Sequence, residues 1–180
     1  MEFKKIQLNG FKSFAEKTNF QIDDGLTGIV GPNGCGKSNI VESLRWCMGE
    51  TSAKSMRGSG MEDVIFSGTS NKPSKNIAEV SISLLNETNQ GPHQYKELKE
   101  IEIRRKIEKD KGSKFYINDK EVRAKDAQMF FADLSTGAHS PSLISQGRIG
   151  ALVTAKPSDR RAILEEAAGI AGLHVRRHEA

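Results

Sequence analysis

The chain has few cysteines and no long apolar run, and each shortage excludes a class of protein. Its 180 residues include two cysteines, Cys35 and Cys47, without CxxC spacing. Neither a disulfide framework nor a zinc site is therefore predicted. The apolar stretch at residues 26–30 is far shorter than the roughly 18 residues of a membrane-spanning helix. The N-terminal residues also lack the apolar core of a signal peptide. We expect a cytoplasmic protein without a membrane segment.

Charge of neither sign dominates the sequence. Lys and Arg number 27 against 23 Asp and Glu, for a net charge of +4. This excess is compatible with a nucleic-acid partner, but many other proteins are equally basic. A hydrophobic content of 36% with 17 glycines is typical of a globular domain and excludes a disordered chain.

Hydrophobic periodicity predicts an α/β fold. Polar and apolar residues alternate, as in half-buried strands, at Lys4–Leu8, Thr18–Ile22, Ile77–Leu85, Leu98–Ile107 and Lys114–Asn118. The apolar run Leu26–Val30 predicts a buried strand. Helical spacing predicts helices at Ser38–Met48, with Glu42 on its polar side, and at Lys125–Leu134. We expect an antiparallel meander beside a parallel nucleotide-binding core.

One segment predicts a phosphate site. Residues 31–38 match G-x-x-x-x-G-K-[ST], the P-loop, between an apolar run and an amphipathic helix. Its glycines let backbone N–H groups point at phosphate oxygens, and the following helix N-terminus adds positive potential. Lys37 would neutralise the β- and γ-phosphates, and the Ser38 hydroxyl would bind Mg²⁺. The predicted ATP cradle consists of Gly31, Pro32, Asn33, Gly34, Cys35, Gly36, Lys37, Ser38 and Asn39.

A catalytic acid to accompany this cradle is missing. A guanine-specific protein needs Asn-Lys-x-Asp, and the segment Asn71–Ser74 lacks the acid. Met129–Asp133 has the apolar-then-acidic pattern of a second metal-binding motif. However, it lies in a helix-like segment without β-branched residues, which disfavours a buried strand.

Several further motifs occur in a fixed order along nearly the whole chain: Ile6–Phe14, Gly31–Asn39, Ser52–Gly58, Met61–Gly68 and Ile144–Ile149. Together they resemble the N-terminal head segment of bacterial structural maintenance of chromosomes (SMC) proteins. The resemblance implies the N-lobe of an ABC-type P-loop ATPase head at 1–157, with a mixed sheet. It also implies the start of a coiled-coil helix at 158–180. In this family a separate C-terminal lobe brings the signature motif, the metal-binding Asp and the catalytic Glu, which would explain the missing acid.

The resemblance also implies roles for residues outside the P-loop. Gln146 resembles the Q-loop glutamine, which contacts Mg²⁺ and the attacking water. Arg57 resembles an arginine-finger-like residue near the phosphates. Without the resemblance, Arg57 would be interpreted as a surface arginine in a flexible loop. Lys12 and Ser13 are expected to reach the nucleotide.

The implied function is ATP-dependent engagement of two heads, coupled to DNA binding in chromosome condensation and segregation. The implied partners are the C-terminal lobe, a second SMC head, kleisin-type subunits and double-stranded DNA bound without sequence preference. Hydrolysis would need the C-terminal lobe. Two alternatives stay open: a DNA-repair relative of the same superfamily, and a self-contained P-loop nucleotide kinase.

Two weaker patterns have ordinary explanations beside functional ones. Basic residues gather around a predicted hairpin at Arg104, Arg105, Lys106, Lys109, Lys111 and Lys114. They predict either DNA phosphate contacts or a solvated hairpin, since acids are interspersed. No aromatic residues are interleaved to stack on bases. His174 and His178 lie one helical turn apart, but two histidines do not complete a zinc site.

Overall fold

One antiparallel sheet organises the molecule. The computed structural model describes residues 1–25, 27–87, 92–134, 156–157 and 160–161. Within these ranges six strands pair in the order β2-β1-β3-β4-β5-β6, and each pairing is antiparallel. The strands are β1 (Glu2–Asn9), β2 (Thr18–Gln21), β3 (Ile77–Leu85), β4 (Glu100–Glu108), β5 (Gly112–Ile117) and β6 (Lys120–Val122).

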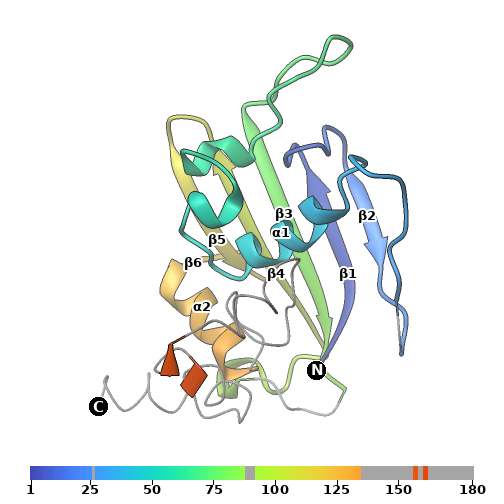
Figure 1. Cartoon of the computed structure of the whole chain (residues 1–180). Coiled ribbons are helices and arrows are strands. Elements are labelled where there is room, and N and C mark those ends of the chain that lie inside the picture. The colour runs from blue at the N-terminus through green and yellow to red at the C-terminus, as the bar shows by residue number, and fades with distance from the viewer. Residues whose placement is uncertain (26, 88–91, 135–155, 158–159, 162–180) are drawn as a thin grey trace.

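Helical segments pack against one face of this sheet. The first α-helix, α1 (Lys37–Cys47), lies across the strands, and α2 (Ala124–Asp133) contacts β5 (Figure 1). Short 3₁₀ turns are η1 (Lys54–Met56), η2 (Met61–Val64) and η3 (His93–Tyr95). The Gln128 amide of α2 donates to the Gly49 carbonyl just past α1 at 2.7 Å, which ties the two helices together. No helix in the described part of the chain is long and apolar enough to cross a membrane.

The hydrophobic core lies between this face of the sheet and the helices. Because side chains alternate along a strand, β4 turns Ile101, Ile103 and Ile107 inward, together with the buried Arg105, and its other charged residues outward. Trp46 of α1 is fully buried, and its ring centroid lies 5.5 Å from that of Phe11. Burial of this apolar surface fixes α1, and with it the residues at its N-terminus, against the sheet.

Most predicted elements are confirmed within a residue or two. The strands at 4–8, 18–22, 77–85, 98–107 and 114–118 correspond to β1, β2, β3, β4 and β5, and both predicted helices are present. Strand β6 was not predicted, because three residues carry no periodicity. Pro157, Arg160 and Arg161 are helical, and the Arg160 amide donates to the Lys156 carbonyl at 3.1 Å. The remainder of the predicted coiled-coil helix lies outside the described residues, so the 157/158 boundary stays a prediction.

The predicted buried strand at 26–30 is wrong over its described part. Residues 27–30 are irregular, and Ile29 and Val30 are 45% and 93% exposed. A buried strand needs hydrogen-bonded neighbours at its edges. The six strands of the described sheet pair with one another and not with this segment. The parallel core expected around it is therefore absent from the part of the chain that the structure describes.

Candidate functional site

The predicted P-loop forms an exposed turn that leads directly into α1. Residues 31–35 are exposed, and α1 begins at Lys37. Gly34 and Gly36 adopt positive φ angles of 85° and 94°, a conformation that favours glycine. Gly36 is the N-cap of α1, and no described side chain caps this helix. The first backbone N–H groups of α1 therefore remain available to an anion.

Neighbouring side chains lie close to two glycines of the turn. A Cβ atom at Gly36 would lie 2.6 Å from Ser13 Oγ, and one at Gly31 would lie 2.9 Å from Cys35 Sγ. A larger side chain at either position would therefore displace Ser13 or Cys35 from the loop. The glycine turn and the free helix N-terminus fit a nucleotide phosphate.

Lys37 lies across this loop. Its ammonium group donates to the carbonyl oxygens of Gly31 and Pro32, each at 2.6 Å, and lies 3.9 Å from Cys35 Sγ. The cation is thus held over the cradle by groups that a phosphate oxygen can replace with a stronger, charge-assisted hydrogen bond. Ser38 is the next residue of α1 and its side chain is exposed, as a metal-binding hydroxyl must be.

Two loops bring further predicted residues to the first turns of α1. Asn39 donates through Nδ2 to Ser13 Oγ at 2.8 Å, and its Oδ1 accepts from the Arg57 guanidinium at 3.4 Å. Lys12 donates to the Met56 carbonyl at 2.5 Å. The structure therefore brings Lys12, Ser13 and Arg57, which are distant in sequence from Asn39, to one edge of the P-loop helix.

Glu42 lies at the centre of these residues. It is 7% exposed, and its two carboxylate oxygens form ion pairs with Lys12 and Arg57. The sequence predicts that Glu42 lies on the polar side of α1, and in the structure this side is covered at Glu42 by Lys12 and Arg57. The helical pattern identifies the side opposite the apolar stripe, but it does not show that two loops cover that side. The spacing from Asn39 to Glu42, three residues on one helix face, was the available signal.

The loop that carries Arg57 has its own internal bonds. Arg57 adopts a left-handed conformation at φ 55°. Downstream, the Asp63 carboxylate accepts from the backbone N–H groups of Ser59 and Gly60 at 2.6 and 2.9 Å. These hydrogen bonds hold the pKa of the Asp63 carboxyl below its usual value, and the bond from Gly60 has the larger effect. The Arg57 N–H itself donates to the Lys54 carbonyl at 3.0 Å, and the Arg57 side chain is 59% exposed.

Other candidate residues lie elsewhere. Gln146, His174 and His178 are outside the described residues. Met129–Asp133 belongs to α2, where Phe130 and Phe131 are buried, and the predicted helix is confirmed there.

The basic hairpin residues do not form one surface. Arg105 is buried under α1, whereas Arg104 forms ion pairs with Glu79 and Asp119 on the opposite face. Lys111 and Lys114 form ion pairs with Glu108 and Glu121. This arrangement favours a solvated hairpin over a preformed anion site.

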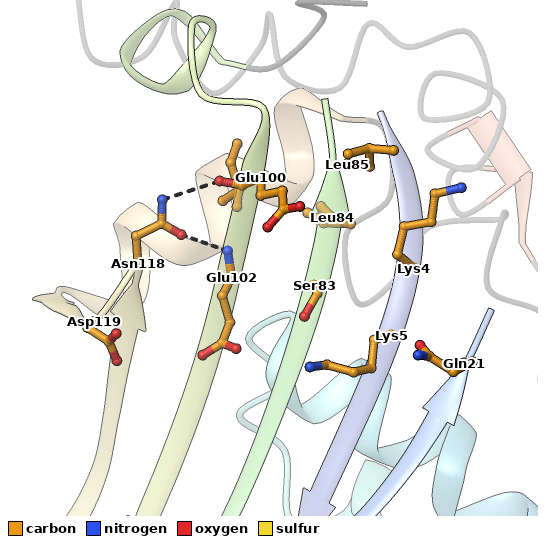
Figure 2. A pocket seen from close by; sticks show the side chains of 11 residues that line it. Lys4, Lys5, Gln21, Ser83, Leu84, Leu85, Glu100, Glu102, Asn118 and Asp119 are labelled. Atoms are coloured by element: carbon orange, nitrogen blue, oxygen red, sulfur yellow. Dashed lines mark hydrogen bonds between the residues drawn. The ribbon is translucent and has the colours of Figure 1, made fainter. Parts of the chain in front are cut away.

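A hollow of about 560 Å³ lies on the face of the sheet that α1 leaves open (Figure 2). It is lined by Lys5, Ser83 and Glu102, which alternate along their strands with core residues. Asn118 spans its edge and accepts from the Glu102 N–H at 2.7 Å. Mixed charges and no glycine loop distinguish this hollow from the P-loop cradle.

Comparison with known proteins gives the family. The family model described as "RecF/RecN/SMC N terminal domain" matches residues 2–147. Proteins named "Chromosome partition protein Smc" from Cereibacter sphaeroides and Rhodopseudomonas palustris are 57% and 54% identical over 180 residues. These matches cover 100% of this chain but 16% of each relative.

Solved SMC head structures share the fold. A head bound to the C-winged helix domain of ScpA is 32% identical, with a TM-score of 0.87 over 95% of this chain and 52% of that one. A structure described under ATP-driven dimerization and DNA-stimulated activation of SMC ATPases is 30% identical, with a TM-score of 0.79 over 93% of this chain and 99% of that one. The ABC-type N-lobe fold is thereby confirmed, and the chain belongs to the RecF/RecN/SMC N-terminal domain family, as the head segment of a bacterial SMC protein.

Proposed function

We propose that this chain is the ATP-binding N-terminal lobe of the head of a chromosome-organising SMC ATPase. One observation carries the proposal. The exposed glycine turn and Lys37 at the start of α1 are surrounded by Lys12, Ser13 and Arg57, which two separate loops deliver to the same place. A turn used only for chain reversal would not need such an assembly of cations and donors.

Each residue then has a chemical task toward ATP and Mg²⁺. The backbone N–H groups of residues 33–38 and the Lys37 ammonium would hold the β- and γ-phosphates. The Ser38 hydroxyl and the Gln146 side chain would hold Mg²⁺, and Gln146 would also orient the attacking water. When bound, Mg²⁺ would supply charge neutralisation at the phosphoryl oxygens. Arg57 stabilises the negative charge that develops on the transferred phosphoryl group.

Hydrolysis is proposed to need a second lobe. The chain spans 16% of the length of the relatives named above, and its sequence has no evident catalytic acid. Ile29 and Val30, which lie directly before the P-loop, are apolar and exposed. Their exposure supports a second lobe that covers this segment. A C-terminal lobe would supply the acid, the signature motif and the partner strands. The isolated chain would bind nucleotide weakly and hydrolyse almost none.

The proposed partners follow from the family. ATP would lie between two engaged heads, and hydrolysis would separate them and change how the protein holds DNA. The DNA contact is proposed to be to phosphates and independent of sequence. A kleisin-type subunit is proposed from the ScpA-bound relative. The setting would be the cytoplasm, at the nucleoid.

ATPase activity of the chain alone and mixed with the C-terminal head lobe of a relative tests this function. We expect no turnover by the chain alone and Mg²⁺-dependent turnover by the mixture. Lys37→Ala should abolish that turnover, since it removes the phosphate-binding cation. Arg57→Ala should lower kcat by on the order of 10³, the lower end for an arginine that stabilises phosphoryl transfer. Steady turnover by the isolated chain would instead favour a self-contained P-loop enzyme.

A further inference from the structure

Two cationic side chains beside the P-loop, Lys12 and Arg57, converge on the carboxylate of Glu42. It lies on α1, one helical turn after Ser38 and Asn39, and is almost completely buried. Its Oε2 pairs with Lys12 and its Oε1 with Arg57, so each oxygen serves a different loop. A buried carboxylate without cationic partners would be strongly destabilising.

The Lys12 contact also fixes the backbone next to Arg57. The Lys12 ammonium donates to the carbonyl of Met56, the residue that precedes Arg57. The Lys12 backbone N–H donates to the Val64 carbonyl at 2.7 Å, so Lys12 connects both ends of the 56–64 loop. Glu42 therefore acts on Arg57 twice, directly through the guanidinium and indirectly through Lys12 and the Met56 peptide.

The exposure of these side chains distinguishes the supporting residues, Glu42 and Lys12, from Arg57, which can reach the nucleotide. Counted over the side chain alone, Glu42 and Lys12 are 10% and 13% exposed, whereas Arg57 is 59% exposed. Only Arg57 extends from this network toward solvent on the side of Asn39 and the phosphate cradle. A long side chain with this much freedom loses considerable entropy when it must occupy one position, unless part of it is already fixed.

We propose that Glu42 is a positioning residue that aims the Arg57 guanidinium at the phosphates of bound ATP. The inference rests on the proposed function, because it assumes that Arg57 acts on the phosphoryl group. Glu42 itself does not touch the nucleotide. Its effect must therefore pass through Arg57, and it should be seen in kcat more than in KM. Misplacement of a catalytic group by about 1 Å can cost on the order of 10²-fold in rate.

A double-mutant cycle in the mixed head, made of this chain and the C-terminal lobe, tests this dependence. Glu42→Gln keeps the size of the side chain and removes its charge. We expect it to lower kcat by about 10- to 100-fold with KM changed less than about threefold. In the Arg57→Ala background the same change should have no further effect, because the group that Glu42 positions is gone. The matched control, Glu79→Gln, breaks the ion pair with Arg104 on the open face of the sheet and should leave kcat unchanged.

A second variant covers the case in which Glu42→Gln does not fold. Glu42→Asp keeps the charge but shortens the reach of the carboxylate. It should lower kcat severalfold with Arg57 present and have no effect with Arg57→Ala. Equal losses in both backgrounds, for either variant, would overturn the inference and leave the ATPase assignment intact. Absence of Lys37-dependent turnover in the unmodified mixture would overturn the proposed function and this inference together.

Discussion

At the scale of single residues, the two cysteines show how position decides chemistry. Cys35 is exposed in the P-loop, whereas Cys47 is fully buried, with its Sγ 3.5 Å from the carbonyl oxygens of Val80 and Ile103. Burial raises the pKa of the Cys47 thiol to about 12. Because the thiolate is the nucleophile, Cys47 stays protonated and unreactive at any pH at which the protein is assayed.

Alkylation should therefore occur at Cys35 alone and should report on the nucleotide. We expect iodoacetamide to modify one cysteine between pH 7 and 9, with Cys35→Ser leaving the folded chain unlabelled. At an ATP concentration of about ten times Kd, labelling should slow by about tenfold, because bound chain no longer presents the thiol. Mass spectrometry of the labelled peptide measures both the site of modification and its rate with and without ATP. Equal rates with and without ATP would contradict a nucleotide phosphate at this loop.

At the scale of elements, Arg105 connects the P-loop helix to the antiparallel sheet. It extends from β4 beneath the end of α1, where it donates to the carbonyl oxygens of Trp46 and Glu50 at 2.7 Å each. Its guanidinium lies 4.5 and 4.6 Å from the ring centroids of Trp46 and Phe115. Burial lowers the pKa of Arg105 to about 10, so the group remains charged at neutral pH.

Replacement of Arg105 should destabilise the fold far more than replacement of its neighbour. Arg105→Met removes the charged donor that the Trp46 and Glu50 carbonyl groups share, together with the contacts of the guanidinium with two aromatic rings, and we expect a loss of about 2–4 kcal/mol in the free energy of unfolding. Arg104→Met, on the opposite and more exposed face of the same strand, should cost less than about 1 kcal/mol. Urea denaturation of both variants measures the difference. Similar losses would show that Arg105 is not a specific link between α1 and the sheet.

Periodicity predicted the elements, but not which polar residues are buried. The alternation of polar and apolar residues predicted the exact bounds of β3. The same alternation places Arg104 and Arg105 on opposite faces of the sheet, although their shared charge suggested that they belong to one basic cluster. Glu42 could not be predicted to be buried, because its cover comes from loops at 12 and 57 whose positions no local pattern specifies. The P-loop was predictable because its chemistry depends on adjacent residues.

At the scale of the whole molecule, the wrong prediction at 26–30 is the most informative. The sequence there has the composition of a buried strand, but Val30 is 93% exposed and the described strands do not pair with it. Local composition reflects the environment in which a segment is finally buried, and here that environment is not provided by the described residues. The proposed C-terminal lobe would provide it.

A substitution at Val30 should therefore weaken lobe association without disturbing this chain. Full burial of a valine side chain contributes about 1.5–3 kcal/mol, so Val30→Asp should weaken binding of the C-terminal lobe by at least about 10- to 100-fold. Val30→Thr keeps the β-branched shape and serves as the matched control, with a smaller loss. Thermal unfolding of the isolated chain should be unchanged in both, since the side chain is almost fully exposed. Isothermal titration calorimetry measures the association. Unchanged affinity for Val30→Asp would mean that the C-terminal lobe docks elsewhere and does not cover the segment before the P-loop.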